Sequence, residues 1–265
     1  MIEKINDTNY YTEFKSIDEF YKYLCDTPFN DAFRWSRHSS VDSGYSFTQT
    51  YSFEEAASLL KNGWDDMAKK LTEKLKAKQT DVVYGKKQKT VYDVCGYQAS
   101  VPRYLQGIPT NMVNKINIPV KQKVITINKC VNYNGLVSIE SIVEESIKAL
   151  QIVKKLEAQG LRVNLNVILG SEKDVRLVTK VRIKSANERL NISKLAFCLV
   201  HPSMLRRMLF RYIEVYPYTT RQFVSGYGRP VANSEMKQFC KGEYLIPAFV
   251  EEDVNSLKDM EYYMA

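Results

Sequence analysis

Apolar residues recur at helical spacing through the first part of the chain. The pattern predicts helices over 16–26, 52–64 and 65–78. The second opens on a Ser and a Glu at capping-box spacing, and the third carries lysines in its last turn. The apolar stripe of the first helix consists of Ile17, Phe20, Tyr21 and Leu24. We therefore expect a helical N-terminal region, residues 1–80.

Residues 81–121 lack a helical period and are rich in glycine, proline and other turn residues. This composition predicts a connecting arm with short strands. A structureless loop of such length is uncommon inside a compact domain. We therefore expect the connecting arm to pack across the surface of its neighbour.

The rest of the chain alternates between strand and helix. A short apolar strand over 123–128, a long amphipathic helix over 138–160 and an alternating strand over 161–169 form a βαβ unit, whose two strands pair in parallel. The next alternating strand, 174–184, follows after only four residues, so we expect it to turn back antiparallel at the edge of the sheet. The fold class expected for 122–265 is therefore α/β, with a mixed sheet and flanking helices.

Three further elements complete the pattern. Residues 191–216 predict one kinked helix or two short ones, 243–250 a late strand, and 251–263 a final helix. We expect the helices among them to pack on the sheet and the strand to extend it.

Composition places the chain among globular proteins of the cytoplasm. Hydrophobic residues make up 45% and charged residues 26%, and no apolar run is long enough for a membrane span. The N-terminus lacks the apolar segment of a signal peptide. The five cysteines are far apart and form no CxxC pair, so we expect reduced thiols rather than disulfides or a zinc site.

The net charge of +8 and the pI near 9.0 leave two interpretations open. A basic balance is typical of proteins that bind nucleic acid or phosphate, and a lysine-rich solvated surface accounts for it equally well. The 18 tyrosines can likewise stack on bases or bridge core and surface.

The strand order resembles the von Willebrand factor A-like fold. In that fold a metal-binding Asp-x-Ser-x-Ser motif follows the first strand, and the matching stretch here is INKCVNYNG, 127–135. Asn128, Cys130 and Asn132 replace the three motif residues. A hard cation prefers anionic oxygen ligands, so the resemblance implies the fold without the metal, and we expect neither a metal nor a cofactor.

Three long blocks also resemble an uncharacterised family of phage-encoded proteins. They are SFEEAASLLKNGW (52–64), YDVCGYQASVPRYLQGIPTNMV (92–113) and LAFCLVHPSMLRRMLFRYIE (195–214). The resemblance implies a phage protein of the host cytoplasm, and it brings no established activity with it.

The stretch HPSMLRRMLFR (201–211) is the first candidate for chemistry. Arg207 and Arg211 share a helix face at i, i+4, and together with Arg206 and His201 they are suited to hold a phosphate. The alternative is a structural histidine before an ordinary helix, with arginines that are solvated or paired with Glu214. Catalysis needs a partner nucleophile or base, and the sequence nominates none.

The strand over 174–184 has one apolar face and one basic face. The basic face includes Arg176, Lys180 and Arg182. If these side chains and the arginines of 206–211 converge on one exposed patch, they favour nucleic acid; if they pair with acids, they favour a protein partner.

Two further stretches combine aromatic and basic residues. Arg34, Trp35 and Arg37 interleave as in single-strand binders, or they anchor a loop on the next helix. Arg103 and Tyr104 stand in a turn-rich part of the connecting arm and are suited to present a recognition edge.

We therefore expect a non-enzymatic protein that binds a protein or nucleic-acid partner and has no membrane contact. The alternative is a nucleic-acid-binding protein that uses the basic face of 174–184 with 206–211. The sequence leaves the oligomeric state open.

Overall fold

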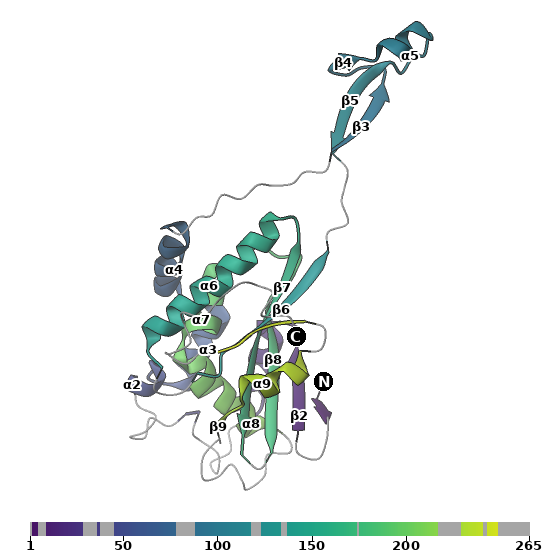
Figure 1. Cartoon of the computed structure of the whole chain (residues 1–265). Coiled ribbons are helices and arrows are strands. Elements are labelled where there is room, and N and C mark those ends of the chain that lie inside the picture. Colours follow the sequence, from purple (N-terminus) through teal and green to yellow (C-terminus); the bar gives the residue numbers. More distant parts are fainter. Residues whose placement is uncertain are drawn as a thin grey trace.

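A computed structural model gives the fold of the chain (Figure 1). The structure describes residues 2–4, 9–28, 36–37, 45–77, 88–117, 123–133, 137–173, 175–216, 229–240 and 243–248. Arg34, Trp35 and the predicted helix over 251–263 lie outside these ranges.

A seven-stranded mixed sheet forms the centre of the protein, in the order β1-β2-β8-β7-β6-β10, with β9 paired to the end of β7. Pairing is parallel between β6 and β7, β6 and β10, and β2 and β8, and it is antiparallel elsewhere in the sheet. The strands are β1 Ile2–Lys4, β2 Asn9–Phe14, β6 Val124–Cys130, β7 Arg162–Glu172, β8 Arg176–Lys184, β9 Arg229–Pro230 and β10 Tyr244–Ile246. The chain is thus an α/β protein, and the predicted βαβ unit with its antiparallel third strand is present.

The prediction that the strand over 174–184 lies at the sheet edge is wrong. β8 pairs with β7 on one side and, in parallel, with β2 on the other, where Thr12 stands opposite Thr179. The N-terminal region is therefore not purely helical, because its first residues extend the sheet. β2 carries an unbroken aromatic and polar run, NYYTEF, whose half-buried alternation gave no clear strand signal.

Helices cover one face of this sheet. The long helix α6 follows β6, α7 and α4 pack against it, α3 packs against α7, and α1 packs against α3 (Figure 1). Their bounds are α1 Ile17–Asp26, α2 Tyr45–Thr48, α3 Phe53–Asn62, α4 Asp65–Ala77, α6 Ile139–Ala158, α7 Ile192–Val200, the π-helical segment η2 Met204–Leu209, and α8 Phe210–Val215. On the opposite face Phe239 of the 3-10 turn η4 (Lys237–Phe239), which follows α9 (Asn233–Met236), stacks on Tyr11. The apolar core lies between the sheet and the helical layer.

The two N-terminal helices begin with the same sequence device. Ser16 caps α1 and Ser52 caps α3, and each hydroxyl accepts a hydrogen bond from the backbone N–H of the Glu three residues later, at 3.1 Å. Glu19 and Glu55 reach back to the backbone N–H that precedes each cap, at 2.6 Å. The capping-box spacing therefore fixed both helix starts from local chemistry alone.

A second, three-stranded sheet in the order β3-β5-β4 stands apart from the rest (Figure 1). It consists of β3 Gln88–Asp93, β4 Gln98–Ala99, the short helix α5 Val101–Leu105 and β5 Met112–Asn117. We call residues 88–117 the β-arm. The expectation that the connecting arm packs across its neighbour is wrong for this part, because the β-arm projects away from the seven-stranded sheet.

The turn from α3 into α4 touches the start of α7. Gly63 has φ +99, and the backbone N–H of Trp64 donates to the carbonyl of Ser193 at 3.0 Å. A side chain at Gly63 would overlap Ser193, whose carbonyl carbon lies 2.9 Å from the Cβ position.

We predict that Gly63→Ala lowers the free energy of unfolding by about 3 kcal/mol, because a strained φ and a backbone overlap add together. Gly160→Ala is the matched control: Gly160 has φ +87 with no atom within 4 Å of its Cβ position, so only the backbone strain of about 1 kcal/mol applies. Urea unfolding of both variants checks this. Equal losses would show that the contact with α7 contributes nothing.

Candidate functional site

Arg207 is the centre of a buried cluster within η2. Its side chain is fully buried and makes four hydrogen bonds, to Ser36 and to the end of α2 and the residues after it. Nε donates to Thr50 Oγ1 at 2.6 Å, Nη1 to the Ser36 carbonyl at 2.8 Å, and Nη2 to Thr48 Oγ1 at 3.2 Å and the Thr50 carbonyl at 2.8 Å. The guanidinium therefore fastens residues near 36 and 48–50 to the helical layer.

The two neighbouring arginines are also directed inward. Arg211 is 1% exposed, donates to the Leu24 carbonyl at 3.0 Å, and pairs with Glu214 at 3.6 Å. Arg206 donates to the Phe47 carbonyl and stacks over the Phe47 ring at 4.1 Å. The prediction that Arg206, Arg207 and Arg211 form an exposed phosphate grip is therefore wrong, since the protein's own carbonyls and hydroxyls occupy their donors.

The basic face of β8 is paired with acids. Arg176 contacts Glu172 and Glu235 at 2.8 and 2.6 Å, and Lys180 contacts Glu13 and Glu243 at 3.5 and 3.2 Å. Arg182 lies 3.8 Å from Glu13. Local neutralisation of this kind removes the free positive charge that a phosphate backbone needs. These three residues and the 206–211 arginines do not converge on one exposed patch.

Asn128 and Asn132, which stand where the metal motif would lie, bond to the protein itself. Asn128 donates to Glu243 at 2.8 Å and accepts from Asn166 at 2.8 Å, which links β10, β6 and β7 across the sheet. The side-chain oxygen of Asn132 accepts from the Gly170 N–H at 3.0 Å. Burial raises the pKa of the Cys130 thiol, so it stays protonated. These residues therefore hold the sheet together, and Glu243, the acidic partner of Asn128, is a residue that sequence reasoning did not single out.

A buried ion pair lies on the helical side of the same strand. The Lys129 ammonium pairs with Glu145 of α6 and also donates to the carbonyls of Cys130 at 2.7 Å and Pro247 at 2.9 Å. A buried charge pair is tolerated when its remaining donors are satisfied. The pair joins β6, α6 and the segment after β10.

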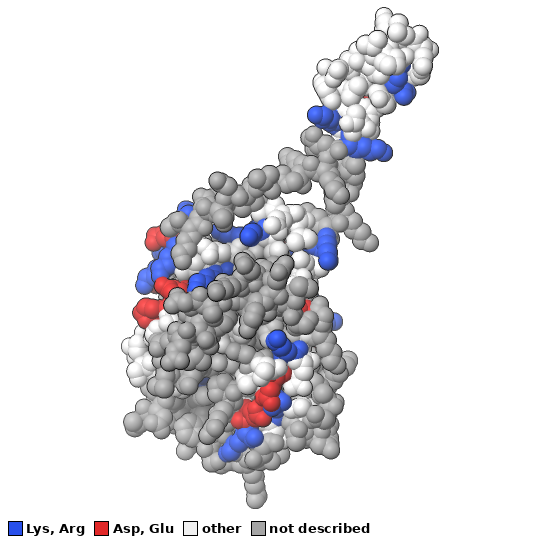
Figure 2. Space-filling model, viewed as in Figure 1, with Lys and Arg blue, Asp and Glu red and all other residues white. Residues whose placement is uncertain are grey.

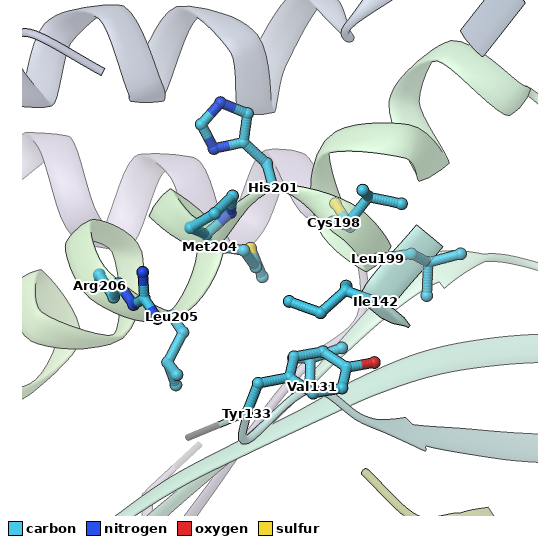
Figure 3. A pocket seen from close by; sticks show the side chains of 11 residues that line it. Val131, Tyr133, Ile142, Cys198, Leu199, His201, Met204, Leu205 and Arg206 are labelled. Carbon is cyan, nitrogen blue, oxygen red and sulfur yellow. The ribbon is translucent and has the colours of Figure 1, made fainter. Parts of the chain in front are cut away.

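His201 is a buried, neutral residue at the end of α7. Its ring lies 4.7 Å from the Trp64 ring and 5.0 Å from the Phe197 ring, and Nδ1 accepts from the Ser203 N–H at 3.1 Å. Burial, together with the charge of Arg207, lowers the pKa of His201 to about 4. It borders a cavity of about 20 Å³, room for about one water molecule (Figure 3).

That cavity is lined mainly by apolar side chains from the segment after β6 and from α6, α7 and η2, among them Val131, Ile142, Cys198 and Met204 (Figure 3). Burial raises the pKa of the Cys198 thiol to about 12, so the thiolate needed for nucleophilic attack does not form near neutral pH. A wider hollow of about 430 Å³ lies between α1 and α3, and there burial likewise raises the pKa of Cys25. Neither cavity presents an activated nucleophile.

Among the described residues, the β-arm carries most of the large hydrophobic side chains that are exposed. Between 89 and 116 every side chain is exposed or half-buried. Ten large hydrophobic side chains are exposed among the described residues, and seven of them belong to the β-arm. These seven are Tyr92, Val94, Tyr97, Val101, Tyr104, Leu105 and Ile116. Monomeric proteins rarely expose apolar side chains in such density, and such patches mark interaction sites.

The structure separates the two β-arm residues that the sequence nominated. Tyr104 is 67% exposed. Arg103 is half-buried: it donates to the carbonyl and the hydroxyl of Thr110 at 2.9 and 3.1 Å, and its guanidinium lies over the Tyr92 ring at 4.3 Å. Arg103 therefore braces the loop between α5 and β5 while keeping part of its charge at the surface. Arg37, the one described member of the other aromatic and basic stretch, is exposed.

The fold and these surfaces define an α/β protein with a mixed sheet and a projecting, apolar β-arm. The chain belongs to the family described as domain of unknown function (DUF7192), whose model matches residues 2–265. Comparison with curated proteins and with solved structures gave no match. Within the described ranges, no helix is both long and apolar enough to cross a membrane.

We predict that Arg207→Lys lowers the free energy of unfolding by about 3 kcal/mol, because an ammonium cannot reproduce the fork of donors to Ser36, Thr48 and Thr50. The same exchange at the exposed Arg189 is the control and changes stability by less than about 0.5 kcal/mol. Chemical denaturation of the two variants tests this. Similar values for both would show that the buried fork does not hold the helical layer together.

The lowered pKa of His201 also predicts a pH dependence. The unfolded chain takes up a proton below its ordinary pKa of about 6.5, whereas folded His201 resists protonation down to about 4. Stability is therefore fully present above about pH 6.5 and falls by up to about 3 kcal/mol as the pH drops to about 4. In His201→Asn this part of the slope disappears. NMR titration of the imidazole checks the pKa directly, and a midpoint near 6.5 would contradict the assignment.

Proposed function

We propose that this protein is a non-enzymatic binding protein and that the β-arm is its main contact surface for a partner, which is a protein or a nucleic acid. The observation that carries the proposal is the concentration of exposed apolar side chains on an element that projects from the fold. The exposed side chains of the β-arm are not buried against the rest of the described chain, so they are available to a partner. Aromatic side chains contribute most to contacts of that kind.

We call the seven-stranded sheet and its helices the body of the protein. The chemistry of the body supports a binding role over catalysis. His201 is neutral and engaged by Ser203, the buried cysteines have raised pKa values, and the ion pairs at β8 are locally neutral. Each of these groups contributes to packing rather than to an activated nucleophile or base. The alternative, a nucleic-acid contact through 174–184 and 206–211, loses its support because those cations are paired or buried.

The cellular location and the scaffold that we propose for this function are argued from the sequence blocks and from the strand order. The resemblance of 52–64, 92–113 and 195–214 to phage-encoded proteins supports a role in the cytoplasm of an infected host. The parallel pair β6 and β7, with β8 antiparallel beside it, supports a von Willebrand A-like core. In this proposal the core serves as the scaffold and the β-arm as the recognition element.

Site-specific photo-crosslinking tests the proposal. A photoreactive phenylalanine analogue replaces Tyr104 of the β-arm or, as the control, Tyr51 of the body, which is 74% exposed against 67% for Tyr104. We expect crosslinked adducts from position 104 that are absent from position 51 in cells that produce the protein. Treatment of the adducts with protease or nuclease tells a protein partner from a nucleic acid. Equal labelling at the two positions would overturn the β-arm as the contact surface.

A further inference from the structure

The net positive charge of the chain is concentrated in the sequence segment that contains the β-arm. Between Lys78 and Lys123 the sequence contains eight Lys and Arg against two Asp, a net charge of +6 within a chain of net +8. Three of these cations, at 89, 103 and 115, belong to the described β-arm, with Asp93 as its one acid. In Figure 2 the β-arm shows blue on a mainly white surface, whereas blue and red lie together on the body. The β-arm itself therefore carries a net charge of +2, from three cations and one acid.

Cations and tyrosines meet on one face of the β-arm sheet. Thr90 stands opposite Lys115 and Tyr92 opposite Val113, and cross-strand partners in an antiparallel pair share a face, so Tyr92 and Lys115 lie on the same side. The Lys115 ammonium is 5.3 Å from the centre of the Tyr97 ring, as Arg103 is 4.3 Å from that of Tyr92. The two rings remain 60% and 49% exposed, so each cation holds a ring that stays open to solvent.

We propose that the β-arm binds single-stranded nucleic acid, with bases stacked on its exposed tyrosines and phosphates held by Arg103 and Lys115. This inference rests on the proposed function and names the partner class. Sequence-tolerant single-strand binders combine the same two features, a basic track and aromatic platforms. Tyr104 of α5 is a third exposed tyrosine of the β-arm.

Other occupants fit these observations less well. Protein interfaces are depleted in lysine relative to the rest of a surface, whereas two of the three cations of the β-arm are lysines. A second copy would bring two arms of like charge together, which is unfavourable. In a duplex the bases are stacked on one another, so the tyrosine rings would gain no stacking partner.

Fluorescence anisotropy of the full chain with labelled oligothymidine, oligouridine and a DNA duplex tests the inference. We expect both single strands to bind more tightly than the duplex at low salt. Two phosphate contacts give a slope of about −1.4 in a plot of log affinity against log salt concentration. Tyr97→Ala or Tyr104→Ala weakens single-strand binding about tenfold through lost stacking.

Two matched controls lie in the body. Tyr51→Ala removes a tyrosine that is also highly exposed, and Lys61→Gln removes a lysine that lies 5.3 Å from the Tyr21 ring, the same distance as Lys115 from Tyr97. We expect both to bind like the unmodified chain, and Lys115→Gln to bind more weakly with a shallower salt slope. Circular dichroism of each variant confirms that the fold is kept.

Two results would overturn the inference: no binding to either single strand at low salt, or equal binding of duplex and single strands that the tyrosine variants leave unchanged. The proposed function is judged separately by the crosslinks at position 104. Protein adducts there, without oligonucleotide binding, would leave the β-arm as a contact surface and reject nucleic acid as its partner.

Discussion

The buried guanidinium of Arg207 is the constraint around which the helical layer is arranged. Removing a charge from water costs several kcal/mol unless its donors find partners, and here Thr48, Thr50 and Ser36 supply them. The loop that leads into α3 must therefore close over η2. Burial, and secondarily the same charge, lowers the pKa of His201, so the histidine packs as a neutral ring against Trp64. The position of the loop follows from one cation placed inside the protein, and that cation also contributes to the protonation state of the neighbouring histidine.

This arrangement divides the cations of the chain into two groups. Those of 206–211 and of β8 are occupied by carbonyls and carboxylates of the body. Those of the β-arm stand beside a single acid and lie near exposed tyrosine rings. A net charge of +8 distributed evenly would indicate only a solvated surface. In the proposed function, the three cations of the β-arm, which stand against a single acid, attract a polyanion.

Local chemistry explains what could be predicted from the sequence. The caps Ser16 and Ser52, the long helix α6 and the β7–β8 hairpin depend on neighbours in the chain, and all are present. The burial of Arg207 could not be predicted, because a helical wheel assumes α-helical spacing and the i→i+5 bonding of η2 turns its faces. β2 was missed because its partner, β8, is far away in sequence. Arg103 and Tyr104 were found because turn-rich segments present side chains outward, but only the structure shows that Arg103 braces Thr110.

The stability of the β-arm has to be local, because it buries no residue between 89 and 116. A small sheet without a core is marginal in water. Here the backbone of Gly96 lies so close to Val113 that no side chain fits between them, and the Arg103 bond to Thr110 closes the other end. These contacts hold apolar side chains in the solvent. This exposure costs free energy, and folding alone would not favour it. The β-arm thus adds no buried residue between 89 and 116 to the core and keeps its tyrosines exposed, which supports its proposed role as a contact surface.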